Sequence, residues 1–154
     1  MTYPEMTRWE RVVGHGQQLG SFDAVFSPRG ADGRPLPVMD PLTGAISPKV
    51  AEAWKPYDIR LVLQTNWATL GPKLRGKIHV LMGDTDTFYL TRATELLRDF
   101  LVTTDFGGYV EIVPGDHGTA ITPALRNRIE AEMAAQFAAF QRTRAPSREP
   151  DRKP

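Results

Sequence analysis

Hydrophobic residues recur at regular spacing only in the part of the chain that follows residue 46. Three segments there place apolar residues three or four positions apart, as amphipathic helices do. Helix starts are indicated by a capping residue at Asp58 and by the pairs Ser47-Pro48 and Thr122-Pro123, because Ser, Thr and Asp cap the first turn and Pro fits into it. The pattern predicts helices over 47–54, 58–70, 90–101 and 122–140.

Two short apolar runs lie between these helices, at residues 77–83 and 109–113. Runs of this kind are typical of strands that are buried on both faces of a parallel sheet. The order strand, helix, strand, helix predicts that the two strands are parallel and joined by a helical crossover. Two strands close neither edge of a sheet, so either the chain has further strands that this pattern does not reveal or the pair is part of a larger sheet.

The two ends of the chain do not show this regularity. Residues 1–46 contain short apolar patches without a clear period, and their second half, 27–48, is rich in Gly and Pro. Residues 142–154 are polar and rich in Pro, which predicts a disordered tail. The expected organisation is an irregular, loop-rich segment (1–46), an α/β region (47–141) and a basic tail (142–154).

Charge and composition exclude several classes of partner. The chain has a formal net charge of +1, and its last 13 residues hold five basic and two acidic groups, which leaves −2 for the rest. A slightly acidic body offers no basic surface for nucleic acid. No apolar run approaches the roughly 20 residues of a membrane span, and the N-terminus lacks a secretory signal pattern. We therefore expect a cytoplasmic protein that binds neither nucleic acid nor membranes.

The chain has no cysteine, which removes disulfides, zinc–thiolate sites and cysteine nucleophiles from consideration. Ionisable residues that remain as candidates follow the two predicted strands. Asp84 and Asp86 come after the first strand, and Asp116 and His117 come after the second. The carboxyl ends of parallel strands meet at one edge, so a carboxylate and an imidazole placed there can pair as an orienting acid and a general base.

Several longer stretches resemble a group of bacterial esterases of the α/β-hydrolase superfamily. They are FSPRGADGRP (26–35), WKPYDI (54–59), LRGKIHVLMGDTDTFYL (74–90) and VPGDHG (113–118). The resemblance covers roughly residues 20–140 and implies the C-terminal half of that fold, with the acid before the histidine. It implies Asp86 as the catalytic acid and His117 as the catalytic base, and it gives Asp84 and Asp116 no essential role.

The chain departs from the family pattern at the nucleophile, which should be a serine in a G-x-S-x-G turn. Of its four serines, Ser21, Ser27 and Ser47 lack the flanking glycines, and Ser147 lies in the tail. Proline follows both Ser27 and Ser47, and it has no N–H to donate to an oxyanion.

Other interpretations of these residues stay open. Asp86 is also placed to cap the next helix, and His117 to lie on the surface as an ordinary loop histidine. Asp84 and Asp86 imitate the DxDxT sequence of phosphatases, but the only lysine after Lys77 is Lys153 in the tail. Asp84, Asp86 and His117 also have atoms suited to a divalent metal, although the sequence has neither HExxH nor EF-hand spacing.

Two functions are consistent with these features. The first is an esterase-like hydrolase of small carboxylic esters, present as its acid and histidine half, with no cofactor and no metal. The second is a non-catalytic domain derived from that fold, which acts through self-association or partner binding. An incomplete sheet leaves apolar surface uncovered, so we expect a homo-oligomer in either case.

Overall fold

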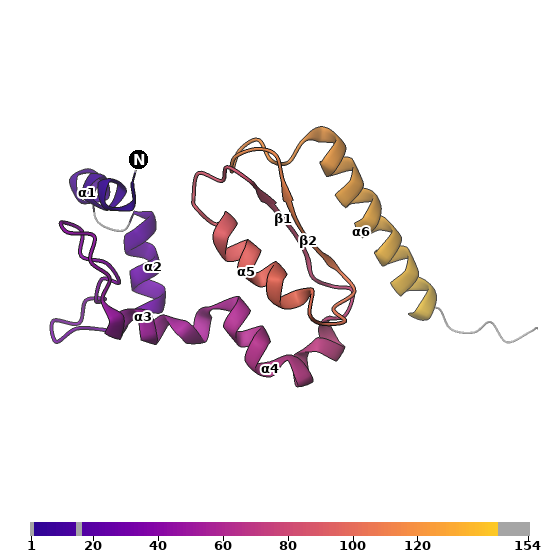
Figure 1. Cartoon of the computed structure of the whole chain (residues 1–154), viewed down its shortest axis with the longest axis horizontal. Coiled ribbons are helices and arrows are strands. Elements are labelled where there is room, and N and C mark those ends of the chain that lie inside the picture. The colour runs from indigo at the N-terminus through magenta and orange to yellow at the C-terminus, as the bar shows by residue number, and fades with distance from the viewer. Residues whose placement is uncertain (1, 15–16, 145–154) are drawn as a thin grey trace, which may run out of the picture. The chain divides into compact units, whose positions relative to one another are not determined.

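A computed structural model describes residues 2–14 and 17–144 of the chain. The described residues form two compact units, one built from those within 2–78 and 99–108 and the other from those within 79–98 and 109–144. They contain six α-helices, one 3-10 helix and a sheet of two parallel strands (Figure 1). The predicted tail lies outside the described residues from Ala145 onward.

The first unit is mainly helical. Its elements are α1 (Tyr3–Val13), α2 (Gln18–Phe26), α3 (Pro48–Trp54), the 3-10 helix η1 (Lys55–Tyr57) and α4 (Ile59–Leu74). Phe26 of α2 packs against the rings of Trp54 and Tyr57, with ring centroids 5.4 and 5.0 Å apart. This aromatic cluster joins α2 to the α3–η1 segment across the intervening loop.

The prediction of an irregular segment over residues 1–46 is wrong for its first half, because α1 and α2 lie there. Helix α1 begins with a capping box, in which the Thr2 hydroxyl accepts a hydrogen bond from Glu5 N and the Glu5 carboxylate accepts one from Thr2 N. Residues 27–47 lack helices and contain only isolated bridges, Arg29–Pro35 and Met39–Ile46. The loop prediction is confirmed for that part of the segment.

Helix α4 starts as predicted, with the Asp58 carboxylate accepting a hydrogen bond from Leu61 N at 2.9 Å. It does not stop at Gly71-Pro72 but continues to Leu74. The backbone departs from helical angles at Asn66, where φ is −114° and ψ is 15°, and the Asn66 side chain donates to Val62 O. Pro72 also lies inside the helix, six residues after Asn66.

The second unit carries the sheet. Strand β1 (His79–Gly83) pairs with β2 (Tyr109–Val113) in parallel, with His79 opposite Tyr109 and Gly83 opposite Val113. Helices α5 (Thr91–Leu101) and α6 (Pro123–Arg144) lie on opposite sides of the two strands (Figure 1). The predicted parallel pairing and the order strand, helix, strand, helix are confirmed.

The strands are less buried than their sequences suggest. His79 is exposed, and the remaining residues of β1 before Gly83 are only partly buried. The sheet face toward α6 is polar, because Tyr109 donates a hydrogen bond to Glu132 at 2.7 Å and Glu111 pairs with Arg128 at 2.9 Å. Helix α6 is thus attached to the sheet partly through polar side chains, which leaves this face incompletely covered.

Candidate active site

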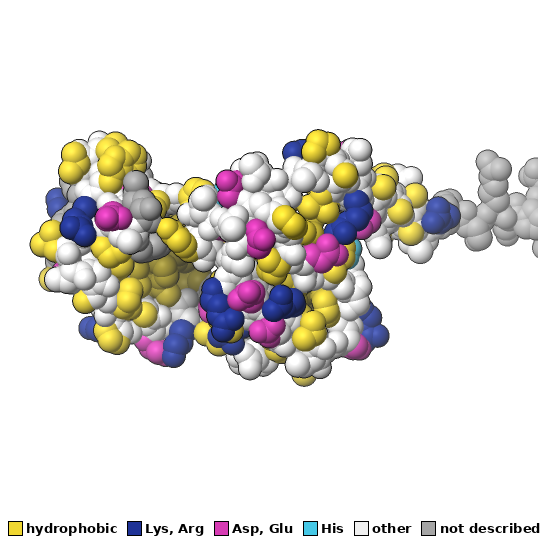
Figure 2. All heavy atoms as spheres, turned by 45° about the horizontal axis from the view of Figure 1, so that its top comes forward, with side chains coloured by type: hydrophobic (Ala, Val, Ile, Leu, Met, Phe, Trp, Pro, Cys, Tyr) yellow, Lys and Arg dark blue, Asp and Glu magenta, His cyan; other side chains and the backbone are white. Residues whose placement is uncertain are grey.

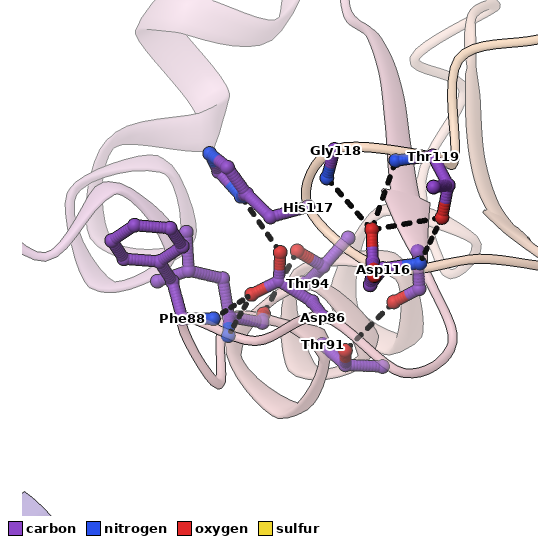
Figure 3. A network of polar contacts seen from close by, with 10 residues as sticks. Asp86, Phe88, Thr91, Thr94, Asp116, His117, Gly118 and Thr119 are labelled. Atoms are coloured by element: carbon purple, nitrogen blue, oxygen red, sulfur yellow. Dashed lines mark hydrogen bonds and ion pairs between the residues drawn. The ribbon is translucent and has the colours of Figure 1, made fainter. Parts of the chain in front are cut away.

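The structure brings Asp86 and His117 together at the carboxyl ends of the two strands. Asp86 lies three residues beyond the end of β1, and His117 lies four residues beyond the end of β2. The Nδ1 atom of His117 is 2.8 Å from Oδ1 of Asp86 (Figure 3). Side-chain exposure differs sharply within the pair, at 1% for Asp86 and 52% for His117.

The carboxylate of Asp86 is held from two sides. Its Oδ2 atom accepts hydrogen bonds from the backbone N–H groups of Phe88 and Leu90, both at 3.0 Å. The hydrogen bond from Leu90 N is the main reason why the pKa of Asp86 is lowered, and the contact with His117 adds to the effect, whereas burial opposes it. Asp86 is therefore a buried, ionised acid with both oxygens engaged.

An ionised carboxylate can only accept hydrogen bonds. The Nδ1 atom of His117 must then carry the proton, which leaves the lone pair on Nε2 when the ring is neutral. Figure 3 shows the second ring nitrogen directed away from Asp86. The pair thus presents one basic atom outward, and Asp86 is placed to stabilise the imidazolium that forms when this atom takes up a proton.

The ring of His117 is also positioned by an aromatic contact. The Phe88 ring lies against it, with centroids 4.3 Å apart and planes inclined by 53°. The same turn contains Tyr89, whose backbone is in the left-handed region at φ 60° and whose N–H bonds to the carbonyl of Asp86. A non-glycine residue in this conformation is strained, and such strain is concentrated at functional turns.

The two loops that carry the pair are fastened to each other. Oδ1 of Asp84 accepts a hydrogen bond from Gly115 N at 2.9 Å, and Thr85 N donates to Gly115 O at 3.1 Å. The backbone of Gly83 approaches Gly115 so closely that a side chain on Gly83 would overlap the Gly115 carbonyl oxygen. These contacts fix the distance between the loops that bear Asp86 and His117.

Asp116 folds the second loop around its own side chain. Its Oδ1 atom accepts hydrogen bonds from Gly118 N, from Thr119 N and from the Thr119 hydroxyl, at 2.8–2.9 Å (Figure 3). The Thr119 hydroxyl bond is the main cause of the lowered pKa of Asp116. Because His117 lies inside this turn, Asp116 sets the direction of the histidine without touching it.

Two threonines anchor the start of α5 beneath the acid. The Thr91 hydroxyl donates to the carbonyl of Gly83 at 2.8 Å, and the buried Thr94 hydroxyl donates to the carbonyl of Leu90 at 3.1 Å. The loop from Gly83 to Leu90 is thus bonded at both ends. The sequence analysis did not predict the roles of Thr91 and Thr94, nor the structural roles of Asp84 and Asp116. Each of these residues lies close to the end of a strand or the start of a helix, where Thr and Asp commonly bond to the backbone.

None of the serines in the described residues has the geometry of a nucleophile elbow. Ser21 lies within α2 and donates to Gln17 O, and Ser47 caps α3. Ser27 ends α2, where its hydroxyl donates to Asp23 and accepts from the indole of Trp54. All three belong to the first unit, and Ser147 lies outside the described residues.

The other chemical interpretations fit less well. Within residues 2–14 and 17–144, no group of three His, Cys, Asp or Glu side chains is arranged to hold a metal ion. Asp84 is occupied by Gly115 N, and both oxygens of Asp86 are occupied by His117 and the backbone. If Asp84 accepted a phosphate, the phosphatase pattern would require a lysine later in the sequence. The only lysine after Lys77 is Lys153.

Among the helices that the structure describes, none combines the length and the apolar character needed to cross a membrane.

Comparisons of the chain with protein-family models, with curated proteins and with solved structures found no match. The site must therefore be interpreted from its own geometry.

Proposed function

We propose that this chain carries the acid and histidine half of an esterase-type hydrolase that acts on carboxylic esters. The observation behind the proposal is the 2.8 Å contact between His117 Nδ1 and the buried carboxylate of Asp86. This contact gives a general base with one open nitrogen. The resemblance of residues 74–90 and 113–118 to bacterial esterases supports the same assignment.

His117 is the general base in this proposal. Its Nε2 atom removes the proton from a hydroxyl group as the oxygen attacks the ester carbonyl, and Asp86 stabilises the resulting imidazolium. The imidazolium then returns the proton to the departing alkoxide. When the hydroxyl belongs to water, the products are the carboxylic acid and the alcohol, and no covalent intermediate forms.

Water is the nucleophile we assign to this chain. Covalent acyl transfer needs a serine on a tight turn with an adjacent N–H donor. Ser21 is inside a helix, and Ser27 and Ser47 are followed by proline. The chain is therefore expected to be a slow hydrolase compared with an enzyme that has a complete triad.

Hydrolysis of p-nitrophenyl acetate by the purified full chain tests the general base. We expect His117→Gln to lower the rate above background by about 10²-fold, the usual contribution of a general base. Asp86→Asn should also lower the rate, because the uncharged amide cannot stabilise the imidazolium. His79→Gln is the matched control, since His79 lies on the same strand pair but outside this site. A rate that is unchanged in His117→Gln, or equally lowered in His79→Gln, would overturn the proposal.

A fluorophosphonate probe distinguishes the two nucleophiles. The water route predicts no adduct on Ser21, Ser27 or Ser47 and no burst of p-nitrophenol. A stoichiometric adduct on one of them that disappears in His117→Ala would instead identify that serine as the nucleophile. Circular dichroism of each variant establishes that the fold is retained.

A further inference from the structure

Helix α6 exposes a row of large apolar side chains. Met133, Phe137 and Phe140 are 66%, 61% and 54% exposed, although they follow each other at spacings of four and three residues. Such residues share one side of a helix. We call them the α6 stripe. Figure 2 shows hydrophobic side chains along the C-terminal part of this helix, up to the basic residues at its end.

The α6 stripe differs from the side of α6 that meets the sheet. That side carries Leu125, Ile129 and Glu132, which are partly buried, and Glu132 binds Tyr109. At 100° per residue, the stripe lies about a quarter turn around the helix from this side. It is also the pattern by which one helix docks on another, with anchors at i, i+4 and i+7. The stripe is thus a separate interaction surface.

Charged residues flank the stripe in an order that fits a second copy of the same helix. Glu130 lies seven residues before Phe137 and Arg144 lies seven residues after it, and both fall on the side that carries the stripe. In an antiparallel pair centred on Phe137, Glu130 of each copy is opposite Arg144 of the other. Opposite charges therefore meet at both ends of the contact.

The same register also matches side-chain sizes. Phe137 meets Phe137 at the centre, and Phe140 of one copy lies over Ala134 of the other, so a large side chain faces a small one. A register shifted by two residues, centred on position 135, would place Arg126 opposite Arg144 and bring like charges together. A parallel pair would set Glu130 beside Glu130 and Arg144 beside Arg144.

We infer that α6 is a homodimerisation surface, in which two copies of the chain pair antiparallel through Met133, Phe137 and Phe140 with Glu130–Arg144 pairs at the ends. This inference does not depend on the proposed esterase activity. The exposed position of the stripe means that its residues can be changed without disturbing the sheet or the Asp86–His117 pair.

Sedimentation velocity of the full chain over a range of concentrations measures the dimer directly. We expect a reversible monomer–dimer equilibrium whose Kd rises by about 30-fold or more in Phe137→Asp, the effect of losing a central anchor. Leu42→Asp is the matched control, because Leu42 is 69% exposed but lies in the 27–47 loop. Its Kd should remain that of the natural chain.

A charge exchange tests the register. Glu130→Arg should weaken the dimer several-fold, since two attractive pairs become repulsive. The double variant Glu130→Arg/Arg144→Glu should restore it. A chain that stays monomeric at every concentration, a Phe137→Asp variant that dimerises like the natural chain, or a double variant as weak as Glu130→Arg would each overturn the inference.

Discussion

Asp86 connects the chemistry of the site with the stability of the fold. Its folded-state pKa is lowered from an ordinary value of 3.8, so the folded protein holds the ionised form more strongly than the unfolded chain does. The resulting stabilisation is present above that value and is lost as the pH falls below it, through the folded-state pKa.

We expect Asp86→Asn to weaken the dependence of the free energy of unfolding on pH in the acid range. Urea unfolding at pH values from about 6 down to about 2 should show the free energy of unfolding falling less steeply in the variant than in the natural chain below about pH 4. The natural chain should also be the more stable of the two at neutral pH. Curves that run parallel over the acid range would contradict the assignment of Asp86 as an ionised acid.

Gly115 is the residue on which the contact between the two loops depends. Its φ is +126°, a conformation that other residues rarely adopt, and a side chain would come within 2.9 Å of the backbone of Ala120. Gly115→Ala should lower the free energy of unfolding by about 2 kcal/mol. It should also lower the rate of the proposed ester hydrolysis, because His117 is two residues away.

Gly118→Ala is the control for this change. A side chain on Gly118 would meet the Asp116 carboxylate at 3.6 Å, which is an ordinary contact. The change in the free energy of unfolding should stay within about 0.5 kcal/mol. Equal destabilisation by the two substitutions would show that the strained backbone of Gly115 has no special importance.

At the scale of elements, the attachment of α6 to β2 rests on a small polar network. The Tyr109 hydroxyl donates to Glu132, and the Arg128 guanidinium lies 5.0 Å from the centre of the Tyr109 ring. The bond to Glu132 is the main reason why the pKa of Tyr109 is raised, because the carboxylate stabilises the protonated hydroxyl. This network adds to the partly buried Leu125 and Ile129 on the same side of α6.

Tyr109→Phe should therefore lower the free energy of unfolding by about 1 kcal/mol, the usual net value of one hydrogen bond. In the Tyr109→Phe variant, amide hydrogen exchange should be faster in α6 than in α5. Tyr57→Phe serves as the control, because Tyr57 is 56% exposed and belongs to the other unit. If both variants unfold at the same urea concentration as the natural chain, the Tyr109–Glu132 bond does not hold α6.

Local signals in the sequence were sufficient for several elements. The caps at Ser47, Asp58 and Thr122 are confirmed, because each accepts a hydrogen bond from the backbone N–H three residues later. The capping box of Thr2 and Glu5 was an equally good signal for α1, and apolar residues recur behind it at positions 3, 6, 9 and 13, so the sequence did mark this helix and its prediction as irregular was wrong. Helix α2 has no side-chain cap and contains Gly20, so little in its sequence marks it.

The position of Asp86 beside His117 could be predicted, because parallel strands bring their carboxyl ends together. The contacts that hold them could not. The Asp84–Gly115 bond and the turn around Asp116 depend on backbone angles that arise only when both loops are formed. The partial exposure of the sheet could not be predicted either, because the sequence of an apolar run such as the one before Gly83 does not depend on whether other elements cover the strand.

At the scale of the whole molecule, the apolar residues are divided unevenly between interior and surface. Among the described residues, the buried hydrophobic ones are Met39, Val50, Leu63, Leu101, Phe106, Val110 and Ala120, and many large apolar side chains remain exposed. Each unit therefore has a small core. A small core gives a small free energy of unfolding and a shallow dependence on denaturant.

The three tryptophans lie at positions 9, 54 and 67, all in the first unit. Tryptophan fluorescence thus reports on that unit, whereas far-ultraviolet circular dichroism reports on the helices of both. We expect the two urea unfolding curves to differ in midpoint, because two units with separate cores need not unfold together. Superimposable curves would show a single cooperative unit.

The register of the strands bears on which changes in chain length the site can tolerate. Residues of β1 and β2 face each other at an offset of 30 positions, whereas Asp86 and His117 are 31 apart. Deleting one residue between Val113 and His117 would turn the histidine away from its acid. An insertion after Leu101 changes only the number of residues between the strands. Related chains can therefore differ in the length of this connection and still keep the pair.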